Sequence, residues 1–463
     1  MKKLPIQIFL WTLLLIGCKS GQEEYLAVYE EGEELLVGSL GVNSRSSNAF
    51  GFEIPGLNFQ DQAKFAVGNS LFNQSWVSSP ASTTARDGLG PTFNARACAA
   101  CHFKDGRGKP ILIDENTTGF LMRLSQEGTN EYGGPLGLEN YGAQIHDFGN
   151  RNVPFEAKIA VRYDTIMGVY ADGTTYTLYK PIYGFEKENF GEIKDVMTSP
   201  RVAQQTIGMG FISALPDSEI LKFADEHDED GDGISGRPNY VWNFDTNEKD
   251  LGKYGWKANA PTLKTQIASA FQGDMGLTNT VFPEEDCPDA QVDCNQAPNG
   301  GAPEVTSKQL ERVLFYQASL SVPNRRNVKE EKVLKGKALF NTLNCIGCHA
   351  IDQVTGEFPI NPLVEGIKIR PYSDFLLHDM GDDLADHRPD YEANGREWRT
   401  QPLWGIGLIP TVNKHTYFLH DGRARNIEEA ILWHGGEAEK SKGAFKKLPK
   451  KQREQLLAFI NSL

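Results

Sequence analysis

Two short runs of the sequence carry residue types that could hold a redox group. Each has two cysteines separated by two residues and followed at once by a histidine: Cys98-Ala99-Ala100-Cys101-His102 and Cys345-Ile346-Gly347-Cys348-His349. Two thiols one helical turn apart lie on one face and can add to the two vinyl groups of a haem, whose iron the histidine can bind. We therefore predict two covalently bound c-type haems, with His102 and His349 as axial iron ligands.

The same cysteine spacing occurs in zinc sites, so the two pairs could instead form one four-cysteine zinc site. Zinc has no need of the histidine that directly follows both second cysteines, and this favours haem. Two disulfides are a third alternative, although a disulfide across this spacing is strained and usually catalytic. The visible spectrum distinguishes haem from the other two.

The start of the chain predicts export and a lipid anchor. Two lysines precede an apolar run at 6–16, which is too short to span a bilayer and has the length of a signal-peptide core. The run ends in Leu15-Ile16-Gly17-Cys18, which resembles a bacterial lipobox. We expect residues 1–17 to be removed and Cys18 to carry lipid, on the periplasmic side of the cell envelope or at the outer membrane. An ordinary signal peptide is the alternative.

The charge of the chain disfavours a nucleic-acid partner. The formal net charge is −14, and no basic cluster with interleaved aromatic residues occurs. An acidic surface favours basic or neutral partners instead.

The two remaining cysteines, Cys287 and Cys294, lie close together in a loop rich in Pro, Asp and Gln. In an oxidising compartment we expect them to form a disulfide. Two free surface thiols are the alternative.

A partial internal repeat accompanies the two cysteine motifs. Gly68-Asn69-Ser70-Leu71-Phe72 precedes the first and Gly336-Lys337-Ala338-Leu339-Phe340 the second; Asp274-Met275-Gly276 and Asp379-Met380-Gly381 follow them. In both helices Gly, Leu and Phe share one face that could pack against haem. The simplest account is a mainly α-helical fold with two cytochrome-c-like domains, the first enlarged by insertions that include a small β element. A chance match of such short strings is the competing account.

We divide the chain into a signal peptide at 1–17, a solvated tether at 18–58, a first haem domain at 59–325 and a second haem domain at 326–463. The β element is expected at 157–179, where Asp172-Gly173 predicts a hairpin turn between strand-like runs. Helical patterns predict helices over 306–320, after Asn426 and after Pro449.

With these pieces in place, the chain resembles the di-haem oxidoreductases related to bacterial cytochrome c peroxidases, and within them the branch named thiol oxidoreductases. The resemblance rests on the order of several motifs: Gly88-Leu89-Gly90-Pro91-Thr92-Phe93-Asn94, Asp105-Gly106-Arg107-Gly108, Gly231-Asp232-Gly233-Ile234-Ser235-Gly236-Arg237-Pro238-Asn239, His378-Asp379-Met380-Gly381, Trp398-Arg399-Thr400, Leu403-Trp404-Gly405-Ile406-Gly407 and Leu419-His420-Asp421-Gly422-Arg423-Ala424-Arg425. The two haem motifs are further apart than in the peroxidases, and no residue matches their distal acid–base group.

The resemblance also points to a sixth iron ligand. By motif order, Met380 resembles the methionine that binds the second haem of the peroxidases, and a thioether ligand raises the potential of a haem. A methionine that only fills the core is the alternative. For the first haem, Met275 occupies the equivalent place in the repeat, where we favour core packing over iron binding, and Met209 and His146 are weaker candidates.

An acidic loop predicts calcium. Asp228, Asp230 and Asp232 stand at alternate positions, like the first half of an EF-hand loop, and Ile234 would add its carbonyl. Related di-haem enzymes hold a calcium ion between their haem domains. Asn239 stands where the usual Glu would be, and a plain acidic turn is the alternative.

These features together predict an exported di-haem oxidoreductase that passes electrons between two haems to a small oxidant, with hydrogen peroxide as the candidate. The expected partners are a redox protein, such as a small cytochrome or a cupredoxin-like donor, and a lipid membrane held through the N-terminal anchor. A di-haem electron carrier without substrate turnover and a redox partner in iron uptake are the alternatives. We further expect Arg423 or Arg425 to contact a haem propionate or form a surface salt bridge. Core packing or electron transfer is expected of Trp242, Trp256, Trp398 and Trp404.

Overall fold

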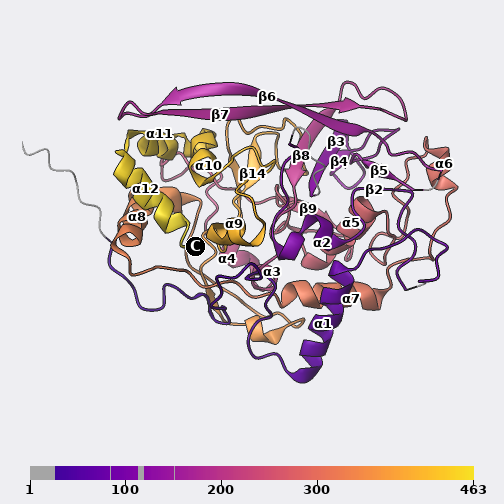
Figure 1. The fold of residues 1–463 in the computed structure, drawn as a ribbon, viewed down its shortest axis with the longest axis horizontal. Coiled ribbons are helices and arrows are strands. Elements are labelled where there is room, and N and C mark those ends of the chain that lie inside the picture. The colour runs from indigo at the N-terminus through magenta and orange to yellow at the C-terminus, as the bar shows by residue number, and fades with distance from the viewer. Residues whose placement is uncertain (1–26, 84, 113–118, 151) are drawn as a thin grey trace, which may run out of the picture.

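The computed structural model of this protein describes residues 27–83, 85–112, 119–150 and 152–463. The expected signal peptide at 1–17 and the lipid-bearing Cys18 lie outside the described residues. Within the described part of the chain, no helix is both long and apolar enough to cross a bilayer. Figure 1 shows short helices on both sides of the molecule and one long two-stranded ribbon that runs across its top.

The α-helices are short. In chain order they are α1 Phe59–Asn73, α2 Cys98–Cys101, α3 Met209–Ser213, α4 Asp217–Leu221, α5 Leu263–Met275, α6 Val292–Asn295, α7 Ser307–Ala318, α8 Glu331–Thr342, α9 Ile409–Val412, α10 Ile427–Trp433, α11 Glu439–Lys447 and α12 Lys450–Ile460. Tighter 3-10 turns connect some of them: η1 Phe103–Asp105, η2 Cys345–Gly347, η3 Pro362–Val364, η4 Ile406–Leu408 and η5 Gly436–Ala438.

The strands form several small antiparallel sheets. The strands are β1 Leu36–Ser39, β2 Thr92–Phe93, β3 Phe120–Thr129, β4 Pro135–Leu136, β5 Phe148–Gly149, β6 Lys158–Val169, β7 Thr175–Glu186, β8 Met197–Val202, β9 Tyr240–Asn243, β10 Glu248–Leu251, β11 Gln353–Val354, β12 Lys368–Ile369, β13 Leu377–Asp379 and β14 Glu397–Arg399. One sheet has three strands in the order β4-β3-β8; β6-β7, β9-β10, β2-β5, β11-β12 and β13-β14 are pairs.

The expectation of a mainly α-helical fold is wrong. The structure is 28% helical and 19% strand, and its strands are spread over many small sheets. Helices form where the two halves of the repeat pack, whereas the segment between them is rich in β-branched and aromatic residues, which favour strands. The expected hairpin is confirmed but longer than predicted: β6 and β7 pair along 12 residues each, and Gly173 takes a positive φ of 83° in the turn.

The partial repeat corresponds to one packing arrangement used twice. A Cβ added at Gly68 of α1 would lie 2.1 Å from the carbonyl oxygen of Arg312 on α7. A Cβ at Gly336 of α8 would lie 2.0 Å from the carbonyl oxygen of Gln455 on α12. A residue without a side chain lets the backbones approach this closely. In each pair, the first helix therefore carries a Gly at the helix contact and, four positions later, a Phe beside one cysteine motif.

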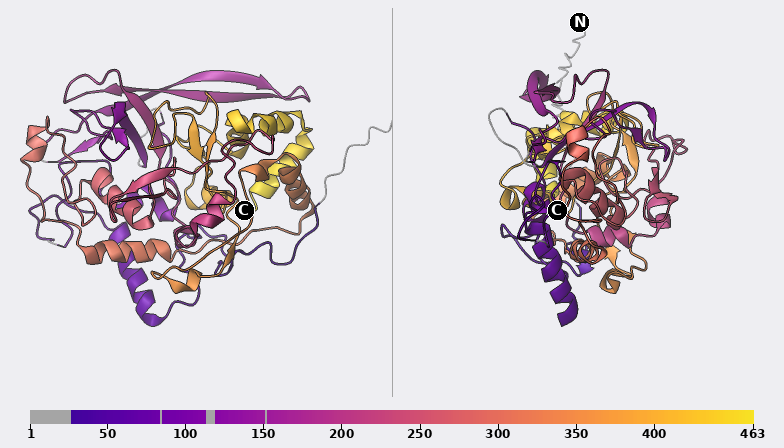
Figure 2. Two further views of the ribbon diagram at one scale, coloured as in Figure 1. Left: turned by 180° about the vertical axis from the view of Figure 1, so that it is seen from behind. Right: turned by 90° about the vertical axis from the view of Figure 1, so that its right-hand side faces the viewer.

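The two pairs lie apart in the molecule. Figure 1 places α8 beside α12 at one side and α1 beside α7 at the lower edge, and in Figure 2 α1 projects from the body in both views. Local sequence signals explain where these helices begin. Thr306 and Gln309 form a capping box at the start of α7, and Asn426 caps α10 by accepting a hydrogen bond from Glu429 N.

The segment before α1 differs from the expected solvated tether at 18–58. Leu36, Val37 and Phe50 are fully buried, and β bridges join Val42 to Pro323 and Glu53 to Leu320. Order in the chain therefore begins before Phe59, because this segment has apolar side chains to bury against the rest of the protein.

We predict that Gly336→Ala destabilises the protein. The new methyl group would meet the carbonyl oxygen of Gln455 at 2.0 Å, and such overpacking costs about 1–3 kcal/mol. Thermal unfolding of the purified protein should show a lower Tm. The matched control is Gly443→Ala in α11, where an added Cβ meets nothing within 4 Å and the helix gains about 1 kcal/mol in propensity. A Gly336→Ala variant as stable as the control would contradict the packing.

Candidate functional site

Each cysteine motif forms one tight turn that presents its histidine. The first is the helix α2, and the second begins with η2. In both, the histidine N–H donates to the carbonyl oxygen of the first cysteine at 2.9 Å, from His102 to Cys98 and from His349 to Cys345. The thiols and the imidazole of each motif therefore project from a single turn, as attachment of one planar group requires.

Cys287 and Cys294 are joined by a disulfide, whereas the four motif cysteines form none. The motif cysteines do not gather into one cluster. In the part of the chain that the structure describes, the group of side chains close enough to share a metal ion consists of three aspartates. The geometry thus gives no support to a shared four-cysteine zinc site.

Three imidazoles are oriented by the same kind of hydrogen bond. Nδ1 of His102 lies 2.6 Å from the carbonyl oxygen of Gln204, and Nδ1 of His349 lies 2.9 Å from that of Tyr372. Nδ1 of His434 lies 2.6 Å from the carbonyl oxygen of Ala430. Because a carbonyl only accepts, each Nδ1 carries the proton and each Nε2 keeps its lone pair. This is the second-sphere arrangement typical of metal-binding histidines.

Burial keeps the same three rings neutral. It lowers the pKa of His102 and His434, and it lowers the pKa of His349 to about 4. Nε2 of His349 and Nε2 of His434 make no hydrogen bond to any residue that the structure describes. A neutral ring with a free Nε2 is the form that binds iron.

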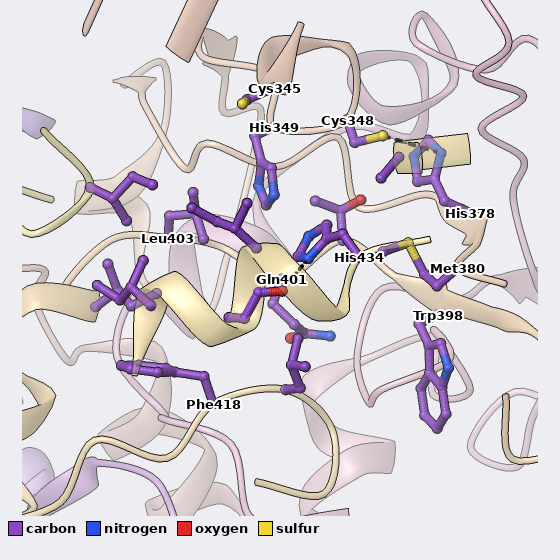
Figure 3. A pocket seen from close by; sticks show the side chains of 18 of the residues that line it. Cys345, Cys348, His349, His378, Met380, Trp398, Gln401, Leu403, Phe418 and His434 are labelled. Carbon is purple, nitrogen blue, oxygen red and sulfur yellow. Dashed lines mark hydrogen bonds between the residues drawn. The ribbon is translucent and has the colours of Figure 1, made fainter. Parts of the chain in front are cut away.

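A cavity of about 240 Å³ lies between two of these histidines. Figure 3 shows the His349 ring projecting toward the side of the cavity where His434 lies, at the end of α10. Much of its wall is apolar and comes from α8 with its C-cap Leu343, from α10 and from α12: Phe340, Leu343, Ile427, Ile431, Leu456 and Ile460. Because one water needs only about 15 Å³, the space suits a large flat apolar group.

The polar atoms of the cavity wall also fit haem. Arg107 Nε and Trp404 Nε1 belong to residues of this wall and are buried without a hydrogen-bond partner among the described residues. A buried donor left unpaired is costly, so these atoms favour a bound group that carries acceptors. The two propionates of a haem are such acceptors. An apolar wall, two thiols, two imidazoles and unpaired donors together form a suitable site for haem.

The cavity extends from the second motif toward the first. Its wall includes Gln204, whose carbonyl accepts the hydrogen bond of His102, and Gln401, whose Oε1 accepts from Gln204 Nε2 at 2.8 Å. Three of the four tryptophans considered from the sequence line it, namely Trp256, Trp398 and Trp404. The fourth, Trp242, packs instead against Tyr132.

Met380 also lines the cavity, beside the strand β13. It therefore lies close to the second motif, as predicted from the sequence. His434, which the fold brings to the same cavity, was not predicted. The available signal was modest: His434 is one of only nine histidines, and it directly follows the capped helix that Asn426 begins. Nothing in the local sequence indicated that this helix would face His349.

His378 lies next to the second motif but has no free nitrogen. Its Nε2 lies 2.8 Å from Asp374 Oδ2, and its Nδ1 lies 2.6 Å from Glu437 Oε2 and 3.4 Å from Cys348 Sγ. Although burial opposes its charge, Cys348 and Asp374 raise the pKa of His378 well above the ordinary value. A protonated ring held between two carboxylates does not bind iron.

Of the residues considered as further iron ligands of the first haem, one lines the cavity and two do not. Both ring nitrogens of His146 are occupied, by the carbonyl oxygen of Gly273 at 2.7 Å and by Thr92 Oγ1 at 3.1 Å. Met275 is buried in the core, whereas Met209 lines the cavity. Arg423 and Arg425, which we expected to contact a haem propionate or form a salt bridge, do not line the cavity. Arg423 pairs with Asp421, and Arg425 pairs with Glu429.

The acidic loop contains a cluster different from the one expected. Carboxylates of Asp225, Asp228 and Asp230 lie within 4.8 Å of one another. Asp232 points elsewhere, because its carboxylate accepts from the N–H of Ile234 at 2.7 Å and from Asn344 Nδ2 at 3.3 Å. The loop thereby contacts the residue that directly precedes the second cysteine motif.

Comparison with known proteins assigns this chain to one protein family. A protein-family model described as "Di-haem oxidoreductase, putative peroxidase" matches residues 34–463. A search of curated proteins finds no match. A solved structure of Kuenenia stuttgartiensis hydrazine synthase, pressurised with xenon, matches this chain at 13% sequence identity and a TM-score of 0.35. The match covers 99% of this chain and 100% of the hydrazine synthase chain. A TM-score this low supports no conclusion about fold or function.

The buried His146 predicts a pH dependence of stability. Burial opposes its charge, but Glu156 and Asp286 raise its pKa to about 9. A pKa that is higher in the folded than in the unfolded protein contributes stability, which is fully present below about pH 6.5 and is lost as the pH rises through about 9. This contribution is at most about 3 kcal/mol. We expect His146→Gln to lower the free energy of unfolding at pH 6 and to differ less from wild type at pH 10, measured by denaturant titration. The exposed His227→Gln serves as control; a pH-independent effect of His146→Gln would contradict the assignment.

Proposed function

Because the chain belongs to the di-haem oxidoreductase family, whose cofactor is haem, we propose that it is an exported c-type enzyme that passes electrons from a redox protein to hydrogen peroxide. One observation supports this most strongly. The cavity that His349 lines also reaches Gln204, whose carbonyl oxygen accepts the hydrogen bond of His102, although no residue of the first motif lines it. Groups bound at the two motifs would therefore share one protein interior, as electron exchange between them requires.

In this proposal, Cys98 and Cys101 attach the first haem, and Cys345 and Cys348 attach the second. His102 and His349 bind the two irons. When bound, haem supplies the one-electron redox steps. The protein residues position the imidazoles through their Nδ1 hydrogen bonds, exclude water with the apolar wall, and offer unpaired donors to the propionates.

For the second haem, we propose that His434 would bind the iron together with His349, with Met380 as the second candidate. His434 is already oriented by its bond to Ala430 and has a free Nε2, whereas Met380 lines the wall without such an orienting contact. Two imidazoles give a low-spin iron of lower potential than one imidazole and one thioether. The choice therefore determines whether the second haem accepts electrons easily.

Two variants distinguish these ligands. We expect His434→Ala to convert the second haem from low-spin to high-spin iron in electron paramagnetic resonance (EPR) spectra, and added imidazole to restore the low-spin signal. Met380→Leu should leave the spectrum and the potential unchanged, because the thioether does not reach the iron in this proposal. A spectrum changed by Met380→Leu and unaffected by His434→Ala would assign the ligand to Met380 instead.

Export, the lipid on Cys18 and a small cytochrome or cupredoxin-like donor also belong to this proposal. The net charge of −14 supports a basic donor, because opposite charges speed encounter. Calcium at the acidic loop stays a prediction, with Asp225, Asp228 and Asp230 as the clustered carboxylates. An ion there would stiffen a loop that contacts Asn344, beside the second motif.

The function is tested by mixing the reduced protein with hydrogen peroxide and a reduced small cytochrome in a stopped-flow spectrometer. We expect catalytic oxidation of the cytochrome, with two molecules oxidised per peroxide, because reduction of peroxide to two waters takes two electrons. Catalase added beforehand should abolish the reaction. Oxidation of only the two haems, with no turnover and no binding of cyanide or peroxide, would instead identify an electron carrier.

A further inference from the structure

A buried tyrosine and a buried aspartate form a pair beside the first cysteine motif. The hydroxyl of Tyr316 on α7 donates to Asp105 Oδ1 at 2.6 Å. Asp105 stands three positions after His102, and its N–H donates to the carbonyl oxygen of that histidine. Tyr316 is 1% exposed and Asp105 is 5% exposed, so the pair is sealed from water.

The second half of the repeat shows that packing does not require this hydroxyl. Tyr316 contacts Phe72 with ring centroids 5.4 Å apart, and Phe72 lies 6.2 Å from the His102 ring. In the other half, Phe459 contacts Phe340 at 5.1 Å, and Phe340 lies 6.1 Å from the His349 ring.

Glycines identify the two positions as equivalent. A Cβ at Gly68 would lie 2.6 Å from Tyr316 Cβ, and a Cβ at Gly336 would lie 2.7 Å from Phe459 Cβ. The same position thus holds Tyr beside the first motif and Phe beside the second. Asp352, three positions after His349, instead pairs at the surface with Lys368 and Arg370.

We propose that Tyr316 is a redox-active residue of the first haem site, giving up one electron while its proton moves to Asp105. The inference rests on the proposed peroxide reduction. The O–H bond of Tyr316 breaks and a new O–H bond forms on the Asp105 carboxylate, leaving a neutral tyrosyl radical and a carboxylic acid. Haem held at the first motif would supply the path by which this electron reaches peroxide, which takes two electrons and two protons from solvent to become two waters. The redox donor supplies the second electron.

The surroundings of Tyr316 favour this coupled transfer. Burial, together with the charge of Asp105, raises the pKa of Tyr316, so the phenolate is not available at neutral pH. Loss of an electron alone would leave a buried cation, which is costly in an apolar interior. Asp105 offers the one hydrogen-bond acceptor that the described residues place at the Tyr316 hydroxyl.

The aromatic neighbours would protect the radical once formed. Phe65 and Phe72 pack against the Tyr316 ring with centroids 4.9 and 5.4 Å away. Neither ring has a hydroxyl that could be oxidised in its place. Tyr316 would therefore hold an oxidising equivalent when peroxide arrives before the redox donor has delivered both electrons.

The test uses EPR on samples of the haem-loaded protein frozen soon after peroxide is added. We expect a tyrosyl signal that changes shape when the protein is made with ring-deuterated tyrosine. Tyr316→Phe should abolish the signal, and it introduces the residue that the second half already has at Phe459. Asp105→Asn should slow its formation roughly a hundredfold, because the amide accepts no proton.

The variants are chosen to keep the fold. Asp105 has a positive φ of 61°, a conformation that Asn tolerates better than most residues. The matched control is Tyr254→Phe. Tyr254 is also buried, but its hydroxyl donates to the carbonyl oxygen of Met209 at 3.0 Å, lies 2.5 Å from Ser213 Oγ, and meets no carboxylate among the described residues. The control should keep the wild-type signal.

Haem absorption recorded on the same samples separates the two claims. If peroxide changes the haem spectrum and the tyrosyl signal persists in Tyr316→Phe, or no such signal forms in the wild type, the role of Tyr316 is overturned while peroxide reduction stands. If peroxide leaves the wild-type haem spectrum unchanged, the proposed function fails, and this role fails with it.

Discussion

The hydrogen bond from an imidazole Nδ1 to a main-chain carbonyl is the interaction on which the haem sites depend. His102, His349 and His434 each make one, to Gln204, Tyr372 and Ala430. It fixes the tautomer and the ring plane together, so that Nε2 faces outward with its lone pair free. The bond has a consequence for the fold as well, because the carbonyls that hold His102 and His349 must be brought to those rings by segments outside the cysteine turns.

The helix pairs support that geometry with one arrangement used twice. Gly68 and Gly336 let α1 and α8 approach α7 and α12 closely, and the phenylalanine four positions later then contacts the histidine of each motif. The two halves differ in the polar groups added to this common frame. The first has a buried Tyr–Asp pair, and the second has His434 and the ion pairs of His378. The shared packing thus leaves the polar groups beside the two motifs free to differ.

The local parts of this structure could be predicted from the sequence. The cysteine motifs, the capping box at Thr306 and the Asp172-Gly173 hairpin are short-range signals, and each acts on neighbouring residues. The proportions of helix and strand could not be predicted, because short strands in small sheets have little hydrophobic periodicity to detect. Contacts between distant residues were also missed. Tyr316 meets Asp105 across 211 positions, and His434 reaches the cavity only when α10 packs beside α11 and α12.

Covalent attachment of haem at both cysteine motifs is the claim on which the proposed chemistry depends most directly. Mass spectrometry of the denatured, acid–acetone-washed chain measures this, followed by analysis of its tryptic peptides. We predict a mass increase of two haems per chain, with one haem on the peptide that contains Cys98 and Cys101 and one on the peptide that contains Cys345 and Cys348. A chain with the mass of its amino acids alone, from cells that attach haem to other c-type cytochromes, would contradict the claim.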